Sequence, residues 1–233
     1  MENYFSNILF LDIETVPAVY KYEELSERMK CFWDKKAAQL AKNESDTPES
    51  LYDKAAIFAE FGKIICISTG TISNNVATIK SFFSHDEKEL LTSFSNYLNS
   101  VQKSEIRLLC AHNGKEFDFP WLCRRMLVNG LNIPEILNTQ GKKPWEISHI
   151  DTMELWKFGD YKSFTSLDLL SEIFEIPTPK DDINGADVAR VYYEENNLIR
   201  IVKYCQKDVI ALIQLFRKLQ NLPLISEVNV LNG

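Results

Sequence analysis

Short apolar runs bounded by turn residues indicate that the first part of the chain is rich in strands. Three of these runs predict strands, at residues 7–11, 63–69 and 76–83. Gly70 and the polar residues 73–75 lie between the last two runs and are typical of a hairpin turn. A helix is then expected from Asp86, because its apolar residues fall on one face: Leu90, Leu91, Phe94 and Leu98.

The segment between the first two predicted strands has a helical pattern instead. Residues 20–42 are rich in Glu, Lys, Ala and Leu, and residues 51–61 predict a second helix that Gly62 ends. The polar residues 43–50 predict the loop between them. We therefore expect a helical insertion near the N-terminus, at about residues 20–61.

Strands and helices alternate in the second half of the chain. A strand is expected at residues 106–111, and a helix at 117–128 is closed by the Asn-Gly pair at 129–130. Residues 131–145 predict a loop, and a short strand is expected at 148–151. Further helices are predicted at residues 166–175, from about 184 onward, and at 198–220.

This order of elements predicts an α/β fold. Three early strands followed by alternating helices and strands indicate a mixed β-sheet flanked by α-helices, with the first strand near its centre. The length of 233 residues fits one large domain better than two small ones, so we expect residues 1–233 to form a single domain. A chain of this size can build a core without disulfides.

Composition narrows the class of protein. Hydrophobic residues make up 45% and charged residues 25% of the chain, as in ordinary globular domains. No apolar run approaches the ~20 residues that a membrane span needs, and the first residues lack the pattern of a signal peptide. The five cysteines are scattered without a CxxC pair. We therefore expect a cytoplasmic protein with reduced thiols, no zinc site and no membrane partner.

The net charge of −7 argues at first against a nucleic-acid partner, because binding to phosphates favours a basic surface. Acidic residues that hold divalent cations would remove this objection, since such a site is locally neutral and can meet a phosphate directly. Net charge therefore leaves the class of partner open.

Asp12 and Glu14 end the first predicted strand. Alternate residues of a strand point to the same face, about 6–7 Å apart. Two buried carboxylates at this separation repel each other and lose hydration, and a divalent cation would remove both penalties. A strand that simply ends in solvent would show the same pair, so the two acids alone do not establish a site.

Two further groups of polar residues lie later in the chain. Asn113 and Asp118 flank the turn after the strand at 106–111, where an acid would also stabilise the N-terminus of the next helix. Tyr204 and Asp208 are four residues apart on the final helix, which places their Cβ atoms about 5–6 Å apart on one face. Each group alone also fits a purely structural role.

The order of the three groups is more informative than any one of them. The chain carries, in sequence, a strand with Asp-x-Glu, a turn with Asn-x-x-x-Phe-Asp and a late helix with Tyr-x-x-x-Asp. In these motifs it resembles the tyrosine-bearing (DEDDy) branch of the DEDD superfamily of 3′–5′ exonucleases. More closely, it is similar to stand-alone predicted exonucleases related to the proofreading domain of family B DNA polymerases. The resemblance extends from Asn7 to about Leu219.

The resemblance implies a ribonuclease H-like fold and the removal of nucleotides, one at a time, from a 3′ end. The implied metal-binding carboxylates are Asp12, Glu14, Asp118 and Asp208. Tyr204 would orient the attacking water. Thr15 matches a position near the terminal nucleotide, and Asn113 and Phe117 match positions beside the site, so these three are the implied substrate-binding residues. The helical insertion and the excess of acidic over basic residues depart from the family pattern. These departures bear on how a substrate would bind and leave the implied chemistry unchanged.

Two divalent cations are the expected cofactors. Hydrolysis of a phosphodiester places charge on the attacking and the leaving oxygen, and two cations roughly 3.5–4 Å apart can stabilise both. The candidate ligands are hard oxygen donors, which Mg²⁺ and Mn²⁺ prefer. The expected partner is nucleic acid with a free 3′ end, single-stranded DNA in our interpretation, and a polymerase or repair protein is a further candidate.

Three alternative functions stay open. The same site would suit a 3′–5′ exoribonuclease that trims RNA. A nucleic-acid-binding or scaffold protein could keep the fold and lose the activity, although all five expected catalytic side chains are present. The third alternative is a proofreading subunit that works beside a separate polymerase, because 233 residues leave no room for a polymerase domain.

Other polar and aromatic residues receive structural interpretations. His112 and His149 are alternative metal ligands, but a structural role is the simpler interpretation of both. Asp151 could support the site, but an acid at the end of a strand is the simpler interpretation of this residue. Two pairs of basic residues are candidate phosphate contacts, although exposed surface residues without a ligand are the simpler interpretation. These pairs are residues 124–125 and 142–143. The aromatic residues expected in the core rather than under a base are Phe82, Phe83 and Trp121.

Overall fold

A six-stranded mixed sheet forms the centre of the protein. The computed structural model describes residues 5–104, 106–160, 162–177 and 183–231. The strand order is β5-β4-β1-β2-β3-β6. The strands are β1 (Ile8–Pro17), β2 (Gly62–Ser73), β3 (Val76–Phe83), β4 (Leu108–Ala111), β5 (Ile150–Asp151) and β6 (Glu227–Leu231). β1, β2 and β3 pair antiparallel, whereas β4, β5 and β6 join in parallel. The predicted mixed sheet with a central first strand is confirmed.

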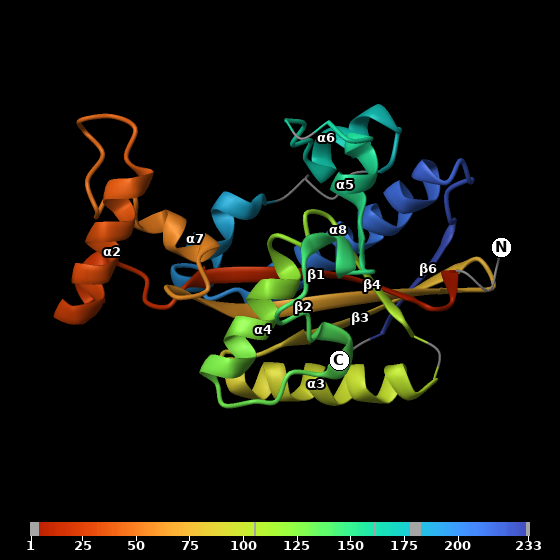
Figure 1. Cartoon of the computed structure of the whole chain (residues 1–233), viewed down its shortest axis with the longest axis horizontal. Coiled ribbons are helices and arrows are strands. Elements are labelled where there is room, and N and C mark those ends of the chain that lie inside the picture. Colours follow the sequence, from red (N-terminus) through yellow and green to blue (C-terminus); the bar gives the residue numbers. More distant parts are fainter. Residues whose placement is uncertain (1–4, 105, 161, 178–182, 232–233) are drawn as a thin grey trace.

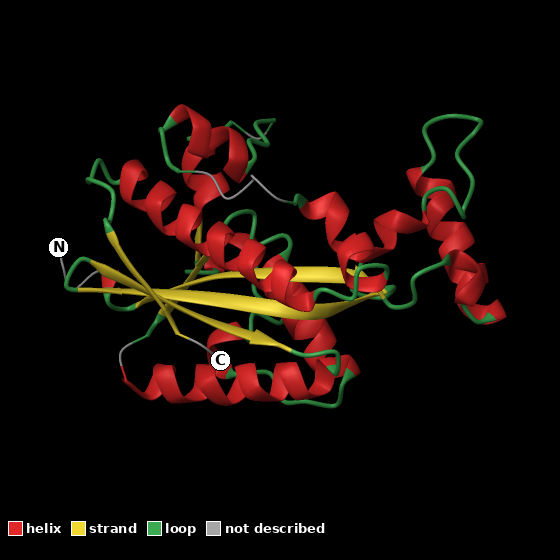
Figure 2. Ribbon diagram, turned by 180° about the vertical axis from the view of Figure 1, so that it is seen from behind, coloured by secondary structure: helices red, strands yellow, loops and turns green. Residues whose placement is uncertain are grey.

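Helices cover both faces of this sheet (Figures 1 and 2). α3 (Glu87–Ser104) and α4 (Asp118–Val128) pack on one face, where Leu9 and Leu11 of β1 join the main apolar core. The apolar residues predicted for one face of α3 are all fully buried in that core: Leu90, Leu91, Phe94 and Leu98. The α/β architecture is therefore confirmed.

α8 (Leu198–Leu219) covers the opposite face of β1. Ile8 and Phe10 point toward it and join Phe216 in a second core. Because side chains alternate along a strand, the same face of β1 next presents residues 12 and 14. Three shorter helices, α5 (Thr152–Lys157), α6 (Leu167–Ile173) and α7 (Val188–Tyr193), also contact α8. Alternation in β1 thus brings two acidic residues under the longest helix.

The insertion forms its own small core beside the sheet. It contains the 3₁₀ turn η1 (Tyr22–Glu24), the helix α2 (Glu27–Leu40) and the 3₁₀ helix η2 (Tyr52–Ile57). α2 begins where the Ser26 side chain accepts a hydrogen bond from the Met29 amide. Trp33 is fully buried in the apolar cluster of the insertion. Figure 1 shows α2 projecting away from the sheet.

Several element boundaries differ from the predictions. The helix expected at 20–42 is a 3₁₀ turn followed by α2, and the helix expected at 51–61 is only η2. Instead of ending a helix, Gly62 begins β2, where a Cβ atom would lie 2.7 Å from the Trp121 ring. The helix expected from about 184 is a 3₁₀ turn, η5 (Gly185–Asp187), followed by α7. These boundaries depend on packing against distant residues.

The hairpin turn between β2 and β3 is shorter than predicted. Asn74 and Asn75 form it with φ values of 50° and 61°, which asparagine tolerates better than most residues. Gly70 lies inside β2, where a Cβ atom would come within 2.7 Å of Ile213 on α8. Its role is therefore close packing rather than turning.

α5 and β6 were not predicted at all. No helix in the described part of the chain combines the length and apolar character required to cross a membrane.

Candidate active site

Asp12 and Glu14 lie inside a strand rather than at its end. β1 continues to Pro17, and both residues pair with β2. Glu14 is 8% exposed and Asp12 is half-buried, so the alternative of a strand ending in solvent is wrong. The register with β2 shifts between Glu14 and Thr15, because Ile65 of β2 has no partner on β1. An extra residue of this kind locally disrupts the ladder, and this one lies directly beside Glu14.

α8 brings three polar side chains to the same face. Tyr204, Cys205 and Asp208 are buried, and the phenol of Tyr204 hydrogen-bonds to the Asp208 side chain. The Cys205 thiol donates to the Asp12 carboxylate over 3.3 Å. One carboxylate oxygen each of Asp12 and Glu14 and the Cys205 sulfur all lie within 4.8 Å of one another. β1 and α8 thus meet through polar groups at this point of an otherwise apolar interface.

Asp118 enters from the other side of β1. It is the first residue of α4, is 3% exposed and accepts a hydrogen bond from the backbone amide of Ile13. The ladder between β1 and β4 ends at the pair Phe10–Cys110, so the edge of β1 beyond it is open to α4. A local feature of the sheet therefore allows this third segment to reach the acid pair.

The turn before α4 is held by Asp151. Its buried carboxylate accepts hydrogen bonds from the backbone amides of Asn113, over 2.9 Å, and Lys115, over 3.1 Å. It also caps α5 by accepting from the Met153 amide over 3.0 Å. Asn113 has a φ of 62°, in the left-handed region. Asp151 thus supports the position of Asp118 through the backbone, as a structural strand-end acid.

The carboxylates of this cluster are crowded and poorly hydrated. Burial raises the pKa of Asp12 well above its ordinary value, and the charges of Asp208 and Asp118 raise it further. The pKa of Glu14 is raised by burial and then by the charges of Asp12 and Asp208. Burial, with a contribution from the charge of Asp151, raises the pKa of Asp118 to about 7. No lysine or arginine is among the groups that mainly set these pKa values. The structure thus places Asp118 and Asp208 close enough to act on Asp12 electrostatically, and burial and neighbouring acids dominate the surroundings of Asp12, Glu14 and Asp118.

Tyr204 is protonated at neutral pH in this environment. Burial raises the pKa of its phenol, and the charges of Asp208, Glu14 and Asp12 raise it further. A phenol with a raised pKa is a hydrogen-bond donor and a poor base. Any role of Tyr204 in chemistry is therefore orientation rather than proton abstraction.

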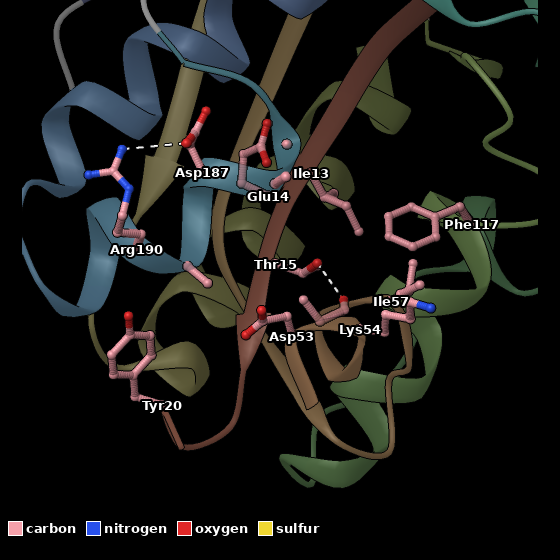
Figure 3. Close-up of a pocket in the computed structure, with 14 residues that line it drawn as sticks. Ile13, Glu14, Thr15, Tyr20, Asp53, Lys54, Ile57, Phe117, Asp187 and Arg190 are labelled. Carbon is pink, nitrogen blue, oxygen red and sulfur yellow. Dashed lines mark hydrogen bonds and ion pairs between the residues drawn. The ribbon is translucent and has the colours of Figure 1, made fainter. Parts of the chain in front are cut away.

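Two of the three predicted substrate-binding residues line a pocket next to the carboxylates. Thr15 and Phe117 lie with Glu14 around a pocket of about 730 Å³ (Figure 3). The hydroxyl of Thr15 donates to the Ala56 carbonyl over 2.7 Å, so it is used to hold the insertion. Asn113 is not among the described residues that line this pocket.

Other polar candidates have structural partners. Both ring nitrogens of His112 are hydrogen-bonded, to the hydroxyl of Thr152 and the carbonyl of Thr165, each over 2.9 Å. Both ring nitrogens of His149 also bind backbone groups, at Leu109 and Ile136. Neither histidine belongs to the carboxylate cluster.

The candidate phosphate contacts separate into two groups. Arg125 forms a buried ion pair with Glu87, so it is neither a phosphate contact nor solvated surface. Arg124 and the lysines at 142–143 are exposed.

Trp121 is buried and Phe82 packs against Phe94, as core residues. The structural interpretation of these aromatic residues is confirmed.

Sequence reasoning missed several residues at this site. Cys205 is one of them, although it lies three residues before Asp208 on the same helix and this spacing could have identified it. Lys54 and Ile57 of the insertion and Arg190 of α7 line the pocket. No local pattern could have identified these three, because only the tertiary structure places their segments beside β1.

Comparisons with known proteins concern the family and the fold of this chain. A family model described as "Predicted 3'-5' exonuclease related to the exonuclease domain of PolB" matches residues 57–224. The matched range includes Asp118, Tyr204 and Asp208 but begins after β1 and most of the insertion.

A solved structure has a similar fold. The chain superposes on the family B DNA polymerase from the hyperthermophilic archaeon Pyrobaculum calidifontis with a TM-score of 0.61 and 14% sequence identity. The similarity covers 91% of this chain and 24% of the polymerase, so the chain spans about a quarter of the length of that protein. At this identity the comparison concerns the fold alone, and the predicted ribonuclease H-like α/β fold is confirmed.

Proposed function

Because the chain belongs to the family of predicted 3′–5′ exonucleases related to the exonuclease domain of PolB, we propose that it is an active, two-metal 3′–5′ exonuclease. Its substrate in this proposal is single-stranded DNA, from which it releases nucleotides one at a time. Asp12, Glu14, Asp118 and Asp208 bind two Mg²⁺ or Mn²⁺ ions. Tyr204 orients the attacking water.

The observation that supports this proposal is the proximity of four largely buried carboxylates from three distant segments, since the charges of Asp208 and Asp118 act on the half-buried Asp12 beside Glu14. Such a group destabilises the folded protein unless a cation compensates its charge. The donors are oxygen atoms, which suit Mg²⁺ and Mn²⁺. Since the pKa values of Asp12, Glu14 and Asp118 are raised, bound cations would also drive ionisation of these groups.

Each residue has a separate task in the proposed reaction. When bound, two cations supply an activated water and stabilise charge on the attacking and leaving oxygens. The carboxylates hold this charge in a buried site, where electrostatic interactions are strong. Tyr204 keeps its proton, so its hydroxyl positions the water by hydrogen bonding. Thr15 and Phe117 contact the terminal nucleotide from the pocket beside Glu14, and Asn113 acts through the turn before α4.

The alternatives differ in their observable products. An exoribonuclease would use the same carboxylates on RNA, and an inactive binding protein would bind strands without shortening them. The buried cluster favours activity over the second alternative, because uncompensated carboxylates without a catalytic role would only lower stability. A polymerase or repair-protein partner and a cytoplasmic location stay predictions.

The test is to offer matched single-stranded DNA and RNA, labelled at either end, with Mg²⁺, Mn²⁺ or a chelator. Successive shortening of 5′-labelled DNA in Mg²⁺ or Mn²⁺, and none in chelator, is the expected result. A blocked 3′ end should stop the reaction, whereas a blocked 5′ end should not. Rapid cleavage of circular strands would contradict the 3′–5′ polarity. Shortening of RNA alone would mean that the substrate is RNA rather than DNA.

A further inference from the structure

The insertion supplies one wall of the pocket beside the carboxylate cluster. β1 contributes the floor of this pocket with Glu14 and Thr15, and η2 contributes Lys54 and Ile57 (Figure 3). Phe117 precedes α4, and the opposite wall comes from η5 and α7. The volume of about 730 Å³ lies within the range of roughly 300–1,000 Å³ that is usual for small-ligand pockets. A mononucleotide could therefore enter it beside the carboxylates.

Hydrogen bonds hold the η2 wall firmly against the sheet and α4. The Thr15 hydroxyl on β1 donates to the Ala56 carbonyl over 2.7 Å. The Trp121 indole of α4 donates to the Ile57 carbonyl over 3.1 Å. Further along, the Arg125 guanidinium donates to the Ala59 carbonyl over 2.9 Å. Three donors from two elements thus bind the carbonyl groups of the wall, so its distance from Glu14 is set by the fold.

The wall and Phe117 together present an apolar surface. Ile57 is 50% exposed, although it is a large apolar residue at a rigid position. Figure 3 shows Phe117 and Ile57 on the same side of β1. The ring of Phe117 packs against Trp121, with centroids 5.9 Å apart, and Trp121 in turn holds Ile57. A flat nucleobase can cover such a surface, because stacking and apolar contact do not depend on base identity.

Lys54 adds a positive charge that is available to a phosphate. The other cation of the pocket, Arg190, is ion-paired with Glu195 and with Asp187. Lys54 is exposed and forms no ion pair among the residues that the structure describes. Its charge acts on the exposed carboxylate of Asp46 from a distance, and Asp53 lines the same pocket. In a protein with a net charge of −7, a pocket for a phosphodiester needs such a local cation. Lys54 is therefore the pocket side chain best suited to bind a backbone phosphate.

We propose that the insertion is part of the substrate site: Ile57 contacts the base of the 3′-terminal nucleotide and Lys54 binds a backbone phosphate of the same strand. The inference rests on the proposed exonuclease function and extends it to the insertion. Ile57 acts with Phe117 as an apolar platform for the base, and Lys54 partly offsets the acidic surface around the carboxylates. Both residues determine affinity for the strand end and take no part in bond cleavage.

The test for Ile57 compares two single strands that differ only in an abasic 3′-terminal residue. Ile57→Ser should raise KM for the normal strand about 5-fold, because it removes apolar contact with the base. For the abasic strand the increase should be less than about 2-fold, since the contact is already absent. The value of kcat should stay within about 2-fold. Ile199→Ser is the matched control, because Ile199 is 51% exposed on α8 and does not line the pocket.

The test for Lys54 uses the salt dependence of binding. Lys54→Gln should weaken binding of both strands about 3- to 10-fold and reduce the slope of log K against log salt by about 0.7, as for one lost phosphate contact on a single strand. Lys42→Gln, an exposed lysine of the same insertion outside the pocket, should change neither quantity. Fluorescence anisotropy with Ca²⁺ in place of Mg²⁺ measures this binding without requiring turnover.

The outcomes separate this inference from the proposed function. If the parent degrades strands but Ile57→Ser raises KM equally for both strands and Lys54→Gln leaves the slope unchanged, the inference is overturned and the exonuclease function stands. If the parent binds strands without degrading them, the exonuclease function fails, and the changes in anisotropy still decide the role of the wall. A parent that neither binds nor degrades strands overturns both.

Discussion

The buried acid Glu87 and the acids of the candidate site have opposite surroundings. Glu87, at the start of α3, accepts hydrogen bonds from both Nε and Nη2 of Arg125, from the Asn129 amide and from the backbone of Ile64. Its side chain is only 7% exposed, so the negative charge is buried but compensated. This ion pair links α3, α4 and β2 and is part of the structural frame.

Among the described groups that act most strongly on Asp12, Glu14 and Asp118, none is a lysine or an arginine. Asp12 accepts a hydrogen bond from the Cys205 thiol, a weak donor, and its strongest electrostatic neighbours after burial are other acids. The sequence contains 26 lysine and arginine residues, and the fold supplies one of them to Glu87. The difference teaches that burial alone does not mark an acid as structural: Glu87 has its counter-charge in Arg125, whereas the pKa values of Asp12, Glu14 and Asp118 are set mainly by burial and by other acids.

The largest expected effect comes from removing an acid of the cluster. Asp12→Ala should reduce turnover roughly 1000-fold or more, because a ligand of the catalytic cations is lost. Without metal, the free energy of unfolding should hold or rise, since repulsion among the remaining carboxylates decreases. Single-turnover assays and urea denaturation in chelator measure both quantities. A large loss of metal-free stability would instead show that Asp12 is a structural acid like Glu87.

The opposite behaviour is expected at the ion pair. Glu87→Gln should lower the free energy of unfolding by about 3–5 kcal/mol, because it leaves the Arg125 guanidinium buried without its counter-charge. Affinity for Mn²⁺ should remain close to that of the parent. Urea denaturation and Mn²⁺ titration test this, with Glu27→Gln as the control, since the pair of Glu27 with Lys30 lies at the surface. Equal stability of Glu87→Gln and the parent would remove the contrast between the two groups.

The candidate site should also make stability depend on pH. The pKa of Asp118 is raised from its ordinary value of 3.8 to about 7. Between these values the metal-free folded protein holds a proton that the unfolded chain has released. Its free energy of unfolding should therefore fall as pH rises from 3.8 toward 7, with a contribution from Asp118 of at most about 4 kcal/mol.

Thermal unfolding at several pH values in chelator measures this dependence. Asp118→Asn should remove part of the decrease, and saturating Mn²⁺ should oppose it because the cation favours the ionised carboxylates. A metal-free stability that rises through this window in the parent, but not in Asp118→Asn, would mean that the folded state lowers the pKa of Asp118.

The smallest expected effect separates the acids from the phenol within the site. Tyr204→Phe keeps the ring and its packing but removes the hydroxyl, so the rate should fall about 10- to 1000-fold, as for a group that orients a reactant. Affinity for Mn²⁺ should be nearly unchanged, because all four carboxylates remain, whereas Asp208→Asn should weaken it. Single-turnover rates and Mn²⁺ titrations distinguish the two variants. Turnover of Tyr204→Phe at the parental rate would make the tyrosine a packing residue.

Local periodicity predicted which side chains share a face, whereas the resemblance of the three motifs to a known family implied that these side chains form a site. Side-chain alternation in a strand puts Asp12 and Glu14 on one face, and a spacing of four residues puts Tyr204 and Asp208 on one face of α8. The same periodicities predicted β3, α4 and α8 closely, because their apolar residues repeat over several turns or pairs. These relations hold within a single element and need no knowledge of distant contacts.

The tertiary structure decided how these elements meet and which charges are compensated. Only the packing of β1 against α8 and the open edge of β1 beside α4 bring Asp118 and Asp208 to the acid pair. The partner of Arg125, the pairing of β6 with β3 and the contact of Ile57 with the pocket also join residues far apart in the chain. The physical reason is that burial and counter-charge are properties of the assembled interior. The sequence therefore determined which side chains share one face of a helix or strand, whereas the fold determined which of these faces lie against each other.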